Sequence, residues 1–427
     1  MLRDSQAHVQ SYLASESKHS NVLLVQGARQ VGKTFMIRNS LQQQPNTISI
    51  NFEREPDVKL AIDSTKKFDE FVDLLTQRFA FKPHAGFTLF IDEAQESEKL
   101  GSYVRFMKEE WTLTKVILTG SSMTRLFPDD VRVPVGRVEY LHIQGFSFRE
   151  FLRMHEVERY LDDAKSTKSI TDELHQILLS WYDKYLHVGG LPDAVIAHKN
   201  GQDFESVLRF IVASQRDDFL RNENVKSYLF LDALKGVANH IGSAAKFTHV
   251  AGNNYDAKKI LQKLQEWYLV SEIEQRGESP TQSFAPKRYL YDLGVLRMLR
   301  DNAIPKISLL HTLDERLRTP LGGLLENAVN IQISKGPPEL GEISGWKKNN
   351  KEPVEVDFVI KHHGVALPIE VKASLNVGER HCKNLFHYCK IFGTKRGVLL
   401  ALDVKKSFSK DQVQIEVIPA YLAEELK

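Results

Sequence analysis

The sequence has very little cysteine, no long hydrophobic run and almost no net charge. Its 427 residues include only 2 cysteines, Cys382 and Cys389, too few for a disulfide framework, which favours a reducing, cytoplasmic compartment. No apolar run approaches the roughly 20 residues that span a bilayer, and the polar amino terminus does not resemble a secretory signal. We therefore expect no membrane partner. The formal net charge of +2 provides no global field toward nucleic acid, so any such contact must come from local patches.

The sequence does contain enough apolar residues for several hydrophobic cores. At 42% hydrophobic content, we expect a multidomain α/β protein. Short apolar strands alternate with amphipathic stretches over residues 22–148, which predicts a mainly parallel sheet in a domain of residues 1–147. Helical spacing predicts a lid or linker at 148–210. Residues 211–300 follow the order helix, turn, helix and two strands, which is typical of a winged helix. Residues 301–427 form a third, smaller α/β domain.

The predicted winged helix has two interpretations. Its second helix, YDAKKILQKLQEWYLV, carries one apolar stripe and several lysines elsewhere. Such a helix can contact DNA, or the domain can be a structural unit or a protein-docking surface.

A nucleotide-binding pattern lies between the first strand and the first long helix. Residues 27–34, GARQVGKT, match G-x-x-x-x-G-K-[ST] in full, after the strand VLLVQ. Glycines let the backbone N–H groups wrap phosphates, and the helix N-terminus adds a favourable dipole. We expect Lys33 to reach the β and γ phosphates of ATP and the Thr34 hydroxyl to ligate Mg²⁺. The residues expected to contact nucleotide here are Gly27, Ala28, Arg29, Gln30, Val31, Gly32, Lys33, Thr34 and Phe35.

The segment FTLFIDEAQ supplies the acids that ATP hydrolysis requires. Asp92 and Glu93 follow a buried strand, at the carboxyl edge where α/β sheets bind ligands. We expect Asp92 to hold Mg²⁺ through water and Glu93 to act as general base on the attacking water. The strand KVILTGSSM ends at Ser121 and Ser122, where a hydroxyl can contact the γ-phosphate; a Gly-Ser-Ser turn is also common without function.

Two arginines are candidates for the cation that neutralises charge in the transition state. Arg137 is our prediction for this catalytic role, with Arg125 as the other candidate. The cation can act within the chain or across a subunit boundary, and the second arrangement requires a homo-oligomer.

Two carboxylates and a lysine share one face of a predicted hairpin near the carboxyl terminus. The strands VEVDFVI and VALPIEVKA are joined so tightly that His363-Gly364 forms a two-residue turn. If residue 362 faces 365, Asp357 faces Glu370, and the period of two places Lys372 on the same face. Facing acids repel, so we expect a cation between them. The alternative is a solvated face carrying a Glu355–Lys372 pair.

This hairpin resembles the D…E-x-K core of restriction-endonuclease-like nucleases, the PD-(D/E)xK superfamily. Glu326, on the preceding helix GGLLENAVN, matches the helix-borne acid of that superfamily. The resemblance implies that Asp357 and Glu370 bind Mg²⁺ with help from Glu326, and that Lys372 orients or activates the attacking water. Val356 stands where the named motif has proline. The histidines and cysteines nearby show no spacing of a zinc site.

The motifs taken together resemble one prokaryotic family. GARQVGKT, TLFIDEAQ, VILTGSS, VGRVEYLHIQGFSFREF, YLHVGGLPDAV, PKRYLYDLG and the series EN…EVDF…IEVKAS are similar to AAA-type ATPases with a C-terminal DUF4143 domain (AAA_14/DUF4143). The resemblance implies an ATPase core, a winged helix and a nuclease-like tail. In this family setting, Gly189, Gly190 and Pro192 either approach nucleotide or only shape a turn.

Three hypotheses follow from these motifs. The first is an Mg²⁺-dependent ATPase whose nucleotide cycle controls a nuclease-like domain that acts on nucleic acid, with DNA as the expected partner. The second is an ATP-dependent regulatory or scaffold protein with a tail that binds DNA or protein without cutting. The third is a signalling ATPase with a transcription-regulating winged helix.

Overall fold

The computed structural model divides the chain into two compact units. It describes residues 3–15, 21–127, 136–167, 169–243, 247–250, 253–279, 281–301, 303–310, 312, 314–335, 343–349, 352, 354–362 and 364–426. Unit 1 comprises Met1–Gln144 and Glu266–Tyr268, and unit 2 comprises Gly145–Gln265 and Leu269–Lys427. His363, one of the two predicted turn residues, lies outside the described residues.

Unit 1 is an α/β domain with a parallel sheet in the order β2-β3-β4-β1-β5. This confirms the predicted fold class. The strands are β1 (Val22–Gln26), β2 (Thr47–Asn51), β3 (Thr88–Asp92), β4 (Lys115–Gly120) and β5 (Val138–His142). The helices are α1 (Gln6–Ala14), α2 (Lys33–Leu41), α3 (Pro56–Ser64), α4 (Phe68–Phe79) and α5 (Leu100–Glu110), with short 3-10 turns η2 (Ala94–Glu96) and η3 (Met123–Leu126).

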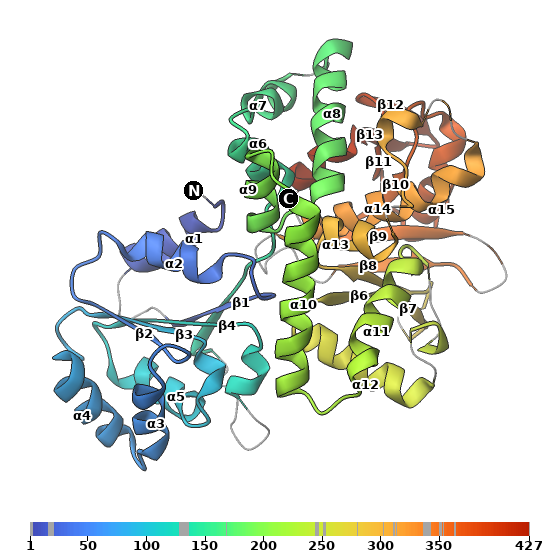
Figure 1. Cartoon of the computed structure of the whole chain (residues 1–427). Helices are drawn as coiled ribbons and strands as arrows, with labels where there is room; N and C mark the ends of the chain where they lie inside the picture. The colour runs from blue at the N-terminus through green and yellow to red at the C-terminus, as the bar shows by residue number, and fades with distance from the viewer. Residues whose placement is uncertain are drawn as a thin grey trace. The chain divides into compact units, whose positions relative to one another are not determined.

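The helices of unit 1 cover both faces of its sheet (Figure 1): α3, α4 and α5 lie on one side, α1 and α2 on the other. Strand β4 is buried at every position, and β3 likewise, because both faces of a parallel sheet are covered. Phe68, Phe71 and Trp111 pack as an aromatic group under the sheet, with ring centroids 5.4–6.0 Å apart. Because all pairs are parallel, the carboxyl ends of the five strands lie at one edge.

Unit 2 contains the remaining helices and one mixed sheet. The helices are α6 (Phe148–Met154), α7 (Arg159–Ser166), α8 (Asp172–Val188), α9 (Pro192–Lys199), α10 (Phe204–Asn222), α11 (Ser227–Asn239), α12 (Asn254–Glu266), α13 (Leu293–Leu299), α14 (Glu315–Ser334) and α15 (Lys383–Phe392), with turns η4 (Phe247–His249), η5 (Ile307–Leu309), η7 (Glu379–Cys382) and η8 (Ala420–Leu426). The predicted apolar stripe of α12 is buried at Ala257, Ile260, Leu261 and Leu264.

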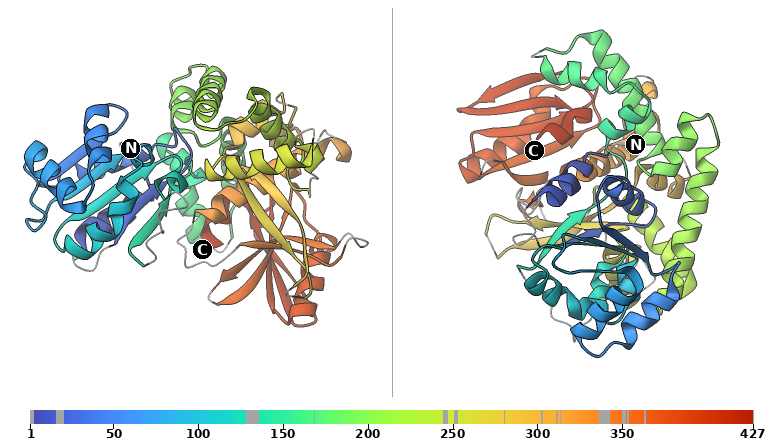
Figure 2. Two further views of the ribbon diagram at one scale, coloured as in Figure 1. Left: turned by 90° about the horizontal axis from the view of Figure 1, so that it is seen from below. Right: turned by 90° about the vertical axis from the view of Figure 1, so that its left-hand side faces the viewer.

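The sheet of unit 2 has the order β12-β13-β11-β10-β9-β8-β6-β7. Its strands are β6 (Val270–Arg276), β7 (Ser283–Leu290), β8 (Ser344–Lys347), β9 (Glu355–His362), β10 (Val365–Lys372), β11 (Arg396–Ala401), β12 (Lys406–Lys410) and β13 (Val413–Pro419). In the left-hand view of Figure 2, the yellow hairpin β6–β7 continues the orange and red strands. The predicted wing therefore shares a sheet with the strands that we assigned to a separate domain beginning at residue 301.

A buried aspartate joins the two sequence motifs VGGLP and YDLG within unit 2. Asp292 caps α13 by accepting from the Val295 N–H at 3.0 Å, and it accepts from the Gly190 N–H at 2.7 Å. A Cβ on Gly189, where φ is +85°, would stand 2.4 Å from the same carboxylate. A Cβ on Gly190 would stand 2.4 Å from the carbonyl oxygen of Phe146, so both glycines of VGGLP are required by close packing, which is a structural role.

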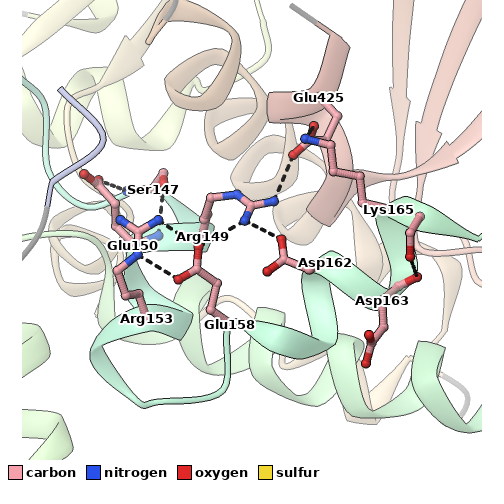
Figure 3. Close-up of polar contacts among 10 residues, drawn as sticks. Ser147, Arg149, Glu150, Arg153, Glu158, Asp162, Asp163, Lys165 and Glu425 are labelled. Carbon is pink, nitrogen blue, oxygen red and sulfur yellow. Dashed lines mark hydrogen bonds and ion pairs between the residues drawn. The ribbon is translucent and has the colours of Figure 1, made fainter. Parts of the chain in front are cut away.

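Charged side chains hold the carboxyl-terminal turn η8 to the helices α6 and α7 (Figure 3). Arg149 donates to Glu158 at 3.0 Å, to Asp162 at 2.7 Å and to Glu425 at 3.2 Å. Lys165 pairs with Glu425 as well. Since Arg149 is largely covered and joins segments 276 positions apart, this network orders the end of the chain.

In the described residues, every helix is too short or too polar to cross a bilayer.

Candidate functional site

The loop 27–32 takes backbone conformations that only glycine adopts easily. Gly27 has φ +147° and Gly32 has φ +91°, and Gly32 directly precedes α2. A Cβ at residue 27 would lie 2.0 Å from the carbonyl oxygen of Ile143. The loop follows the buried strand β1, so its N–H groups and the N-terminus of α2 lie together at the carboxyl edge of the sheet.

Lys33 is buried among backbone carbonyls of this loop. Its ammonium donates to the carbonyl oxygens of Gly27 at 2.8 Å and Ala28 at 2.9 Å. Burial lowers the pKa of Lys33 to about 8, although the carboxylates of Glu93 and Asp92 oppose that shift. A buried ammonium with only neutral partners gains stability from an anion, which a phosphate supplies.

Asp92, the last residue of β3, is held by three neighbours on adjacent elements. Its Oδ1 accepts from Thr34 Oγ1 at 3.0 Å and from the hydroxyl of Thr119 on β4. Its Oδ2 accepts from Asn51 Nδ2, at the end of β2, at 2.9 Å. The predicted pair Thr34 and Asp92 therefore lies side by side, as a shared Mg²⁺ site requires. Thr119 and Asn51 were not predicted.

Glu93 follows in the left-handed conformation, with φ +54°. Burial raises the pKa of its carboxyl group, while Lys33 acts in the opposite direction. Its Oε2 accepts from Gln95 Nε2 at 2.6 Å. A carboxylate with a raised pKa at the edge of a ligand site suits a general base.

The remaining predicted nucleotide contacts occupy varied environments. Arg29 pairs with Glu53 at 2.7 Å, Gln30 has φ +67° and Val31 is buried. Phe35, on the first turn of α2, is 55% exposed, so its ring is available to a nucleotide base. Ser121 is buried directly after β4, the neighbour of β1.

The two candidate arginines lie at opposite edges of the sheet. Arg125, on η3, is 3.6 Å from Glu96 on η2, in the turn that follows Glu93. Arg137 precedes β5, where its carbonyl oxygen accepts from the Val22 N–H at the start of β1, and its guanidinium contacts Glu109 at 2.8 Å. Arg137 therefore lies at the amino edge of the sheet, about one strand length away from the loop 27–32 of its own chain, which we call the phosphate loop after its predicted role.

In unit 2, the predicted hairpin forms in the predicted register. Val365 pairs with His362 and Ile369 with Phe358, so Asp357 and Glu370 come next in line. Val356, Phe358 and Ile369 are fully buried on the other face, as predicted. The N–H of Val371 donates to Asp357 Oδ2 at 2.8 Å, which ties the two strands together at the acids.

The cation beside these acids is an amino group of the chain itself. Lys287 Nζ, on β7, lies 2.7 Å from Asp357 Oδ1, 3.1 Å from Glu326 Oε1 and 3.5 Å from Glu355 Oε1. Tyr289 donates to the same Glu326 oxygen at 2.6 Å. Among the described residues, no three acidic, histidine or cysteine side chains are arranged to hold a metal ion.

Lys372 contacts the other end of this acidic cluster. Its Nζ lies 2.6 Å from Glu370 Oε1, whereas the predicted alternative paired it with Glu355. Burial, and then the charge of Asp357, raises the pKa of Glu370. Burial also raises the pKa of Glu326, whereas the ammonium of Lys287 keeps the pKa of Asp357 low despite burial. Burial and mutual repulsion thus favour retention of a proton on Glu370 or Glu326, while the two ammonium groups oppose it.

A cavity of about 1700 Å³ opens beside these residues within unit 2. Five acidic residues, Glu326, Glu352, Glu355, Asp357 and Glu370, line it together with Lys372. The basic residues along the rest of its lining are Arg300, Arg318, Lys347, Arg380 and His381.

Two lysines of the predicted DNA-contacting helix α12 contact neighbouring groups, and Lys258 and Lys259 are exposed. Lys263 pairs with Glu223 at 3.4 Å, and Lys259 reaches the carbonyl oxygen of Asn224 at 3.4 Å. These lysines are engaged by neighbouring groups of unit 2 itself.

Family comparisons agree with this geometry. Residues 19–152 match the AAA_14 family, described as an AAA domain. Unit 1 is therefore similar to AAA domains over these residues, and we refer to it as the AAA domain. Residues 321–422 match DUF4143 and residues 179–305 match DUF8612, both described as domains of unknown function. The AAA_14 match contains the phosphate loop and Asp92, and the DUF4143 match contains the acids of the hairpin.

Relatives and solved structures share low identity with the chain. An uncharacterized protein of Haemophilus influenzae is 23% identical over 387 residues, covering 86% of each chain. The Walker-type ATPase of Pyrococcus abyssi is 16% identical with a TM-score of 0.43, covering 70% of this chain and 96% of that one. The RuvB branch migration motor of Thermotoga maritima is 14% identical with a TM-score of 0.29, covering 67% and 92%.

Sequence reasoning missed four polar residues of these two sites. In the AAA domain, Asn51 and Thr119 are the polar residues near the ends of strands TISIN and KVILTG, so their position was a usable signal. Beside the DUF4143 acids, Lys287 and Tyr289 share one face of β7 by their spacing of two. Nothing in the sequence indicated that the Lys287 side chain on β7 would contact Asp357 on β9, because the two strands do not pair in the sheet.

Proposed function

We propose that the AAA domain binds and hydrolyses Mg²⁺-ATP at the phosphate loop. The observation that carries the proposal is the placement of Lys33, Thr34, Asp92 and Glu93 at one edge of the sheet. Thr34 and Asp92 offer adjacent oxygen ligands for Mg²⁺, which when bound neutralises phosphate charge.

Each side chain has a separate task in this proposal. Lys33 exchanges its two carbonyl partners for phosphate oxygens, which removes the cost of its burial. Glu93 releases Gln95 and accepts a proton from the attacking water. Asn51 and Thr119 keep Asp92 oriented.

Phosphate release and nucleotide binding, measured separately, test this assignment. We expect Lys33→Ala to lose both, and Glu93→Gln to retain binding while hydrolysis falls by about 10²–10⁴-fold. Lys115→Ala is the matched control, because Lys115 is also buried with a lowered pKa but begins β4 at the opposite edge. Wild-type protein without Mg²⁺-supported affinity for any nucleoside triphosphate would refute the proposal.

For unit 2 we propose binding of nucleic acid without cleavage. The cavity is larger than the roughly 300–1,000 Å³ typical of small-molecule sites, and Arg300, Lys347 and Arg380 line it. Lysines already neutralise part of the acidic floor, so a phosphate backbone meets less repulsion there. The nuclease hypothesis requires a metal where Lys287 lies.

Binding and cleavage assays separate the two hypotheses for unit 2. We expect labelled single- or double-stranded DNA to bind with salt-dependent affinity, weakened by Arg380→Glu but not by Arg209→Glu, whose side chain lies on α10 away from the cavity lining. No product should appear with Mg²⁺ or Mn²⁺. Cleavage that Asp357→Ala abolishes would establish the nuclease instead.

We further propose that the nucleotide cycle controls this binding. DNA affinity measured with ADP and with a non-hydrolysable ATP analogue should then differ, and Lys33→Ala should remove the difference. Equal affinities in both nucleotide states would refute the coupling while leaving both binding activities standing.

A further inference from the structure

The acidic cluster of unit 2 has the composition of a divalent-cation site but is built around an amino group. Its oxygens come from α14, β9 and β10, three elements that converge only in the folded unit. Lys287 reaches it from a fourth element, β7. Its side chain is 2% exposed, so it is more deeply buried than the side chains of Asp357 (7%), Glu326 (11%) and Glu355 (40%) around it.

The distances place the ammonium where a metal would gather the same oxygens. Three carboxylate oxygens, from Asp357, Glu326 and Glu355, lie 2.7, 3.1 and 3.5 Å from Lys287 Nζ. Mg²⁺ and Mn²⁺ bind carboxylate oxygens at about 2.0–2.2 Å, so inward movements of roughly 0.5–1.5 Å by these side chains would coordinate an ion at that point. An ammonium instead makes hydrogen bonds at its observed distances.

One oxygen of the cluster remains without a hydrogen-bond partner. Glu370 is 2% exposed and its Oε1 accepts from Lys372, whereas its buried Oε2 has no hydrogen-bond partner among the described residues. Glu370 lines the cavity beside Asp357 and Glu326. The cluster therefore has a spare buried ligand that Lys287 does not use, which is more than an internal salt bridge needs.

The surroundings hold the ammonium in place. Tyr289, two residues along the same strand, donates to the Glu326 oxygen that Lys287 also contacts. Tyr289 is fully buried, and its ring centroid lies 5.7 Å from that of Phe358, beside Asp357. A Cβ at Gly242 would stand 2.6 Å from Glu326 Oε2, so that glycine lets the backbone close over the acid.

We propose that Lys287 is a built-in replacement for a divalent cation: the chain fills this site with its own ammonium group, and loss of that side chain opens the site to Mn²⁺ or Mg²⁺. Two consequences follow. The wild-type cluster binds no divalent metal. Strand β7 does not pair with β9, so it holds the acids in position through the charge of Lys287.

Mn²⁺ binding to the full chain without nucleotide tests the proposal. Free Mn²⁺ is followed by electron paramagnetic resonance, and thermal unfolding is followed with and without Mn²⁺. We expect Lys287→Met to gain one site at least about tenfold tighter than any wild-type site, with a Mn²⁺-dependent rise in the unfolding temperature of unit 2. The double variant Lys287→Met/Asp357→Asn should lose that site.

Lys372→Met is the matched control. Lys372 also pairs with a buried acid of the cluster, but its side chain is 39% exposed and it contacts only the Glu370 carboxylate. This variant should gain no Mn²⁺ site. If it gains the same site as Lys287→Met, removal of any positive charge suffices, and the replacement proposal is overturned.

Two further outcomes decide the matter. A folded Lys287→Met protein without a new Mn²⁺ site overturns the proposal. If that variant does not fold, wild type is compared with Asp357→Asn: a wild-type Mn²⁺ site that depends on Asp357 overturns the proposal, and its absence up to millimolar Mn²⁺ supports it. ATP hydrolysis in the AAA domain is independent of all these outcomes.

Discussion

Nucleotide binding should take up protons near pH 8 because of Lys33. In the free protein, burial lowers the pKa of this ammonium to about 8, with only carbonyl oxygens as direct partners. Phosphate oxygens of a bound nucleotide stabilise the charged form and so raise the pKa. Protonation and nucleotide binding are therefore linked, and each favours the other.

The size of the effect follows from that pKa. If binding returns the pKa to at least its usual range, uptake per site is about 0.1 proton at pH 7, 0.5 at pH 8 and 0.75 at pH 8.5. Because protons are taken up, affinity falls as pH rises, to about one tenth at pH 9 of its value at pH 7. Phosphate groups, with a pKa of about 6, stay deprotonated across this range.

Calorimetry in two buffers of different ionisation enthalpy at one pH measures the uptake. Mg²⁺-ADP avoids turnover during the titration. Lys33→Arg is the control, since a guanidinium stays protonated at these pH values. Wild-type uptake close to zero at pH 8.5, or equal uptake by Lys33→Arg, would show that the buried ammonium is not the group that meets the phosphates.

Three further changes probe single contacts. Gly27→Ala places a Cβ 2.0 Å from the Ile143 carbonyl oxygen and should abolish nucleotide binding, whereas Gly86→Ala, also at positive φ but with open space, should leave binding intact in the same calorimetric assay. Asp292→Asn keeps one acceptor oxygen but turns its amide NH₂ toward the other backbone N–H. The free energy of unfolding, measured with denaturant, should therefore fall by about 2–4 kcal/mol. Arg149→Met removes the cation shared by three carboxylates. The free energy of unfolding should fall by about 1–3 kcal/mol in the same measurement, and by less in high salt. An unchanged free energy of unfolding would contradict the structural role of the network.

The two units differ in what their charged residues require. In the AAA domain, the buried ammonium of Lys33 donates to two neutral carbonyl oxygens and lies near two acids, so the proposed anionic ligand would stabilise it further. In unit 2, buried acids are already matched by Lys287 and Lys372. In our proposal the first arrangement gains stability when an anionic ligand binds, whereas the charges of the second already stabilise one another within the chain.

Local sequence determined most of the AAA domain and the hairpin of unit 2. The phosphate loop depends on glycines and a lysine at fixed spacing, and β-hairpin register depends on a two-residue turn, so both are set within about ten residues of chain. Asp92 at a strand end and the facing positions of Asp357 and Glu370 followed from the same short-range rules.

The tertiary structure alone decided which groups complete each site. Thr119 and Asn51 reach Asp92 because β2 and β4 flank β3, an order that strand periodicity does not specify. Lys287 reaches Asp357 across 70 positions, from a strand that does not pair with β9. A contact of this kind depends on how a sheet curves and on which helix covers it, and these are set by packing of the whole unit rather than by residues near either partner.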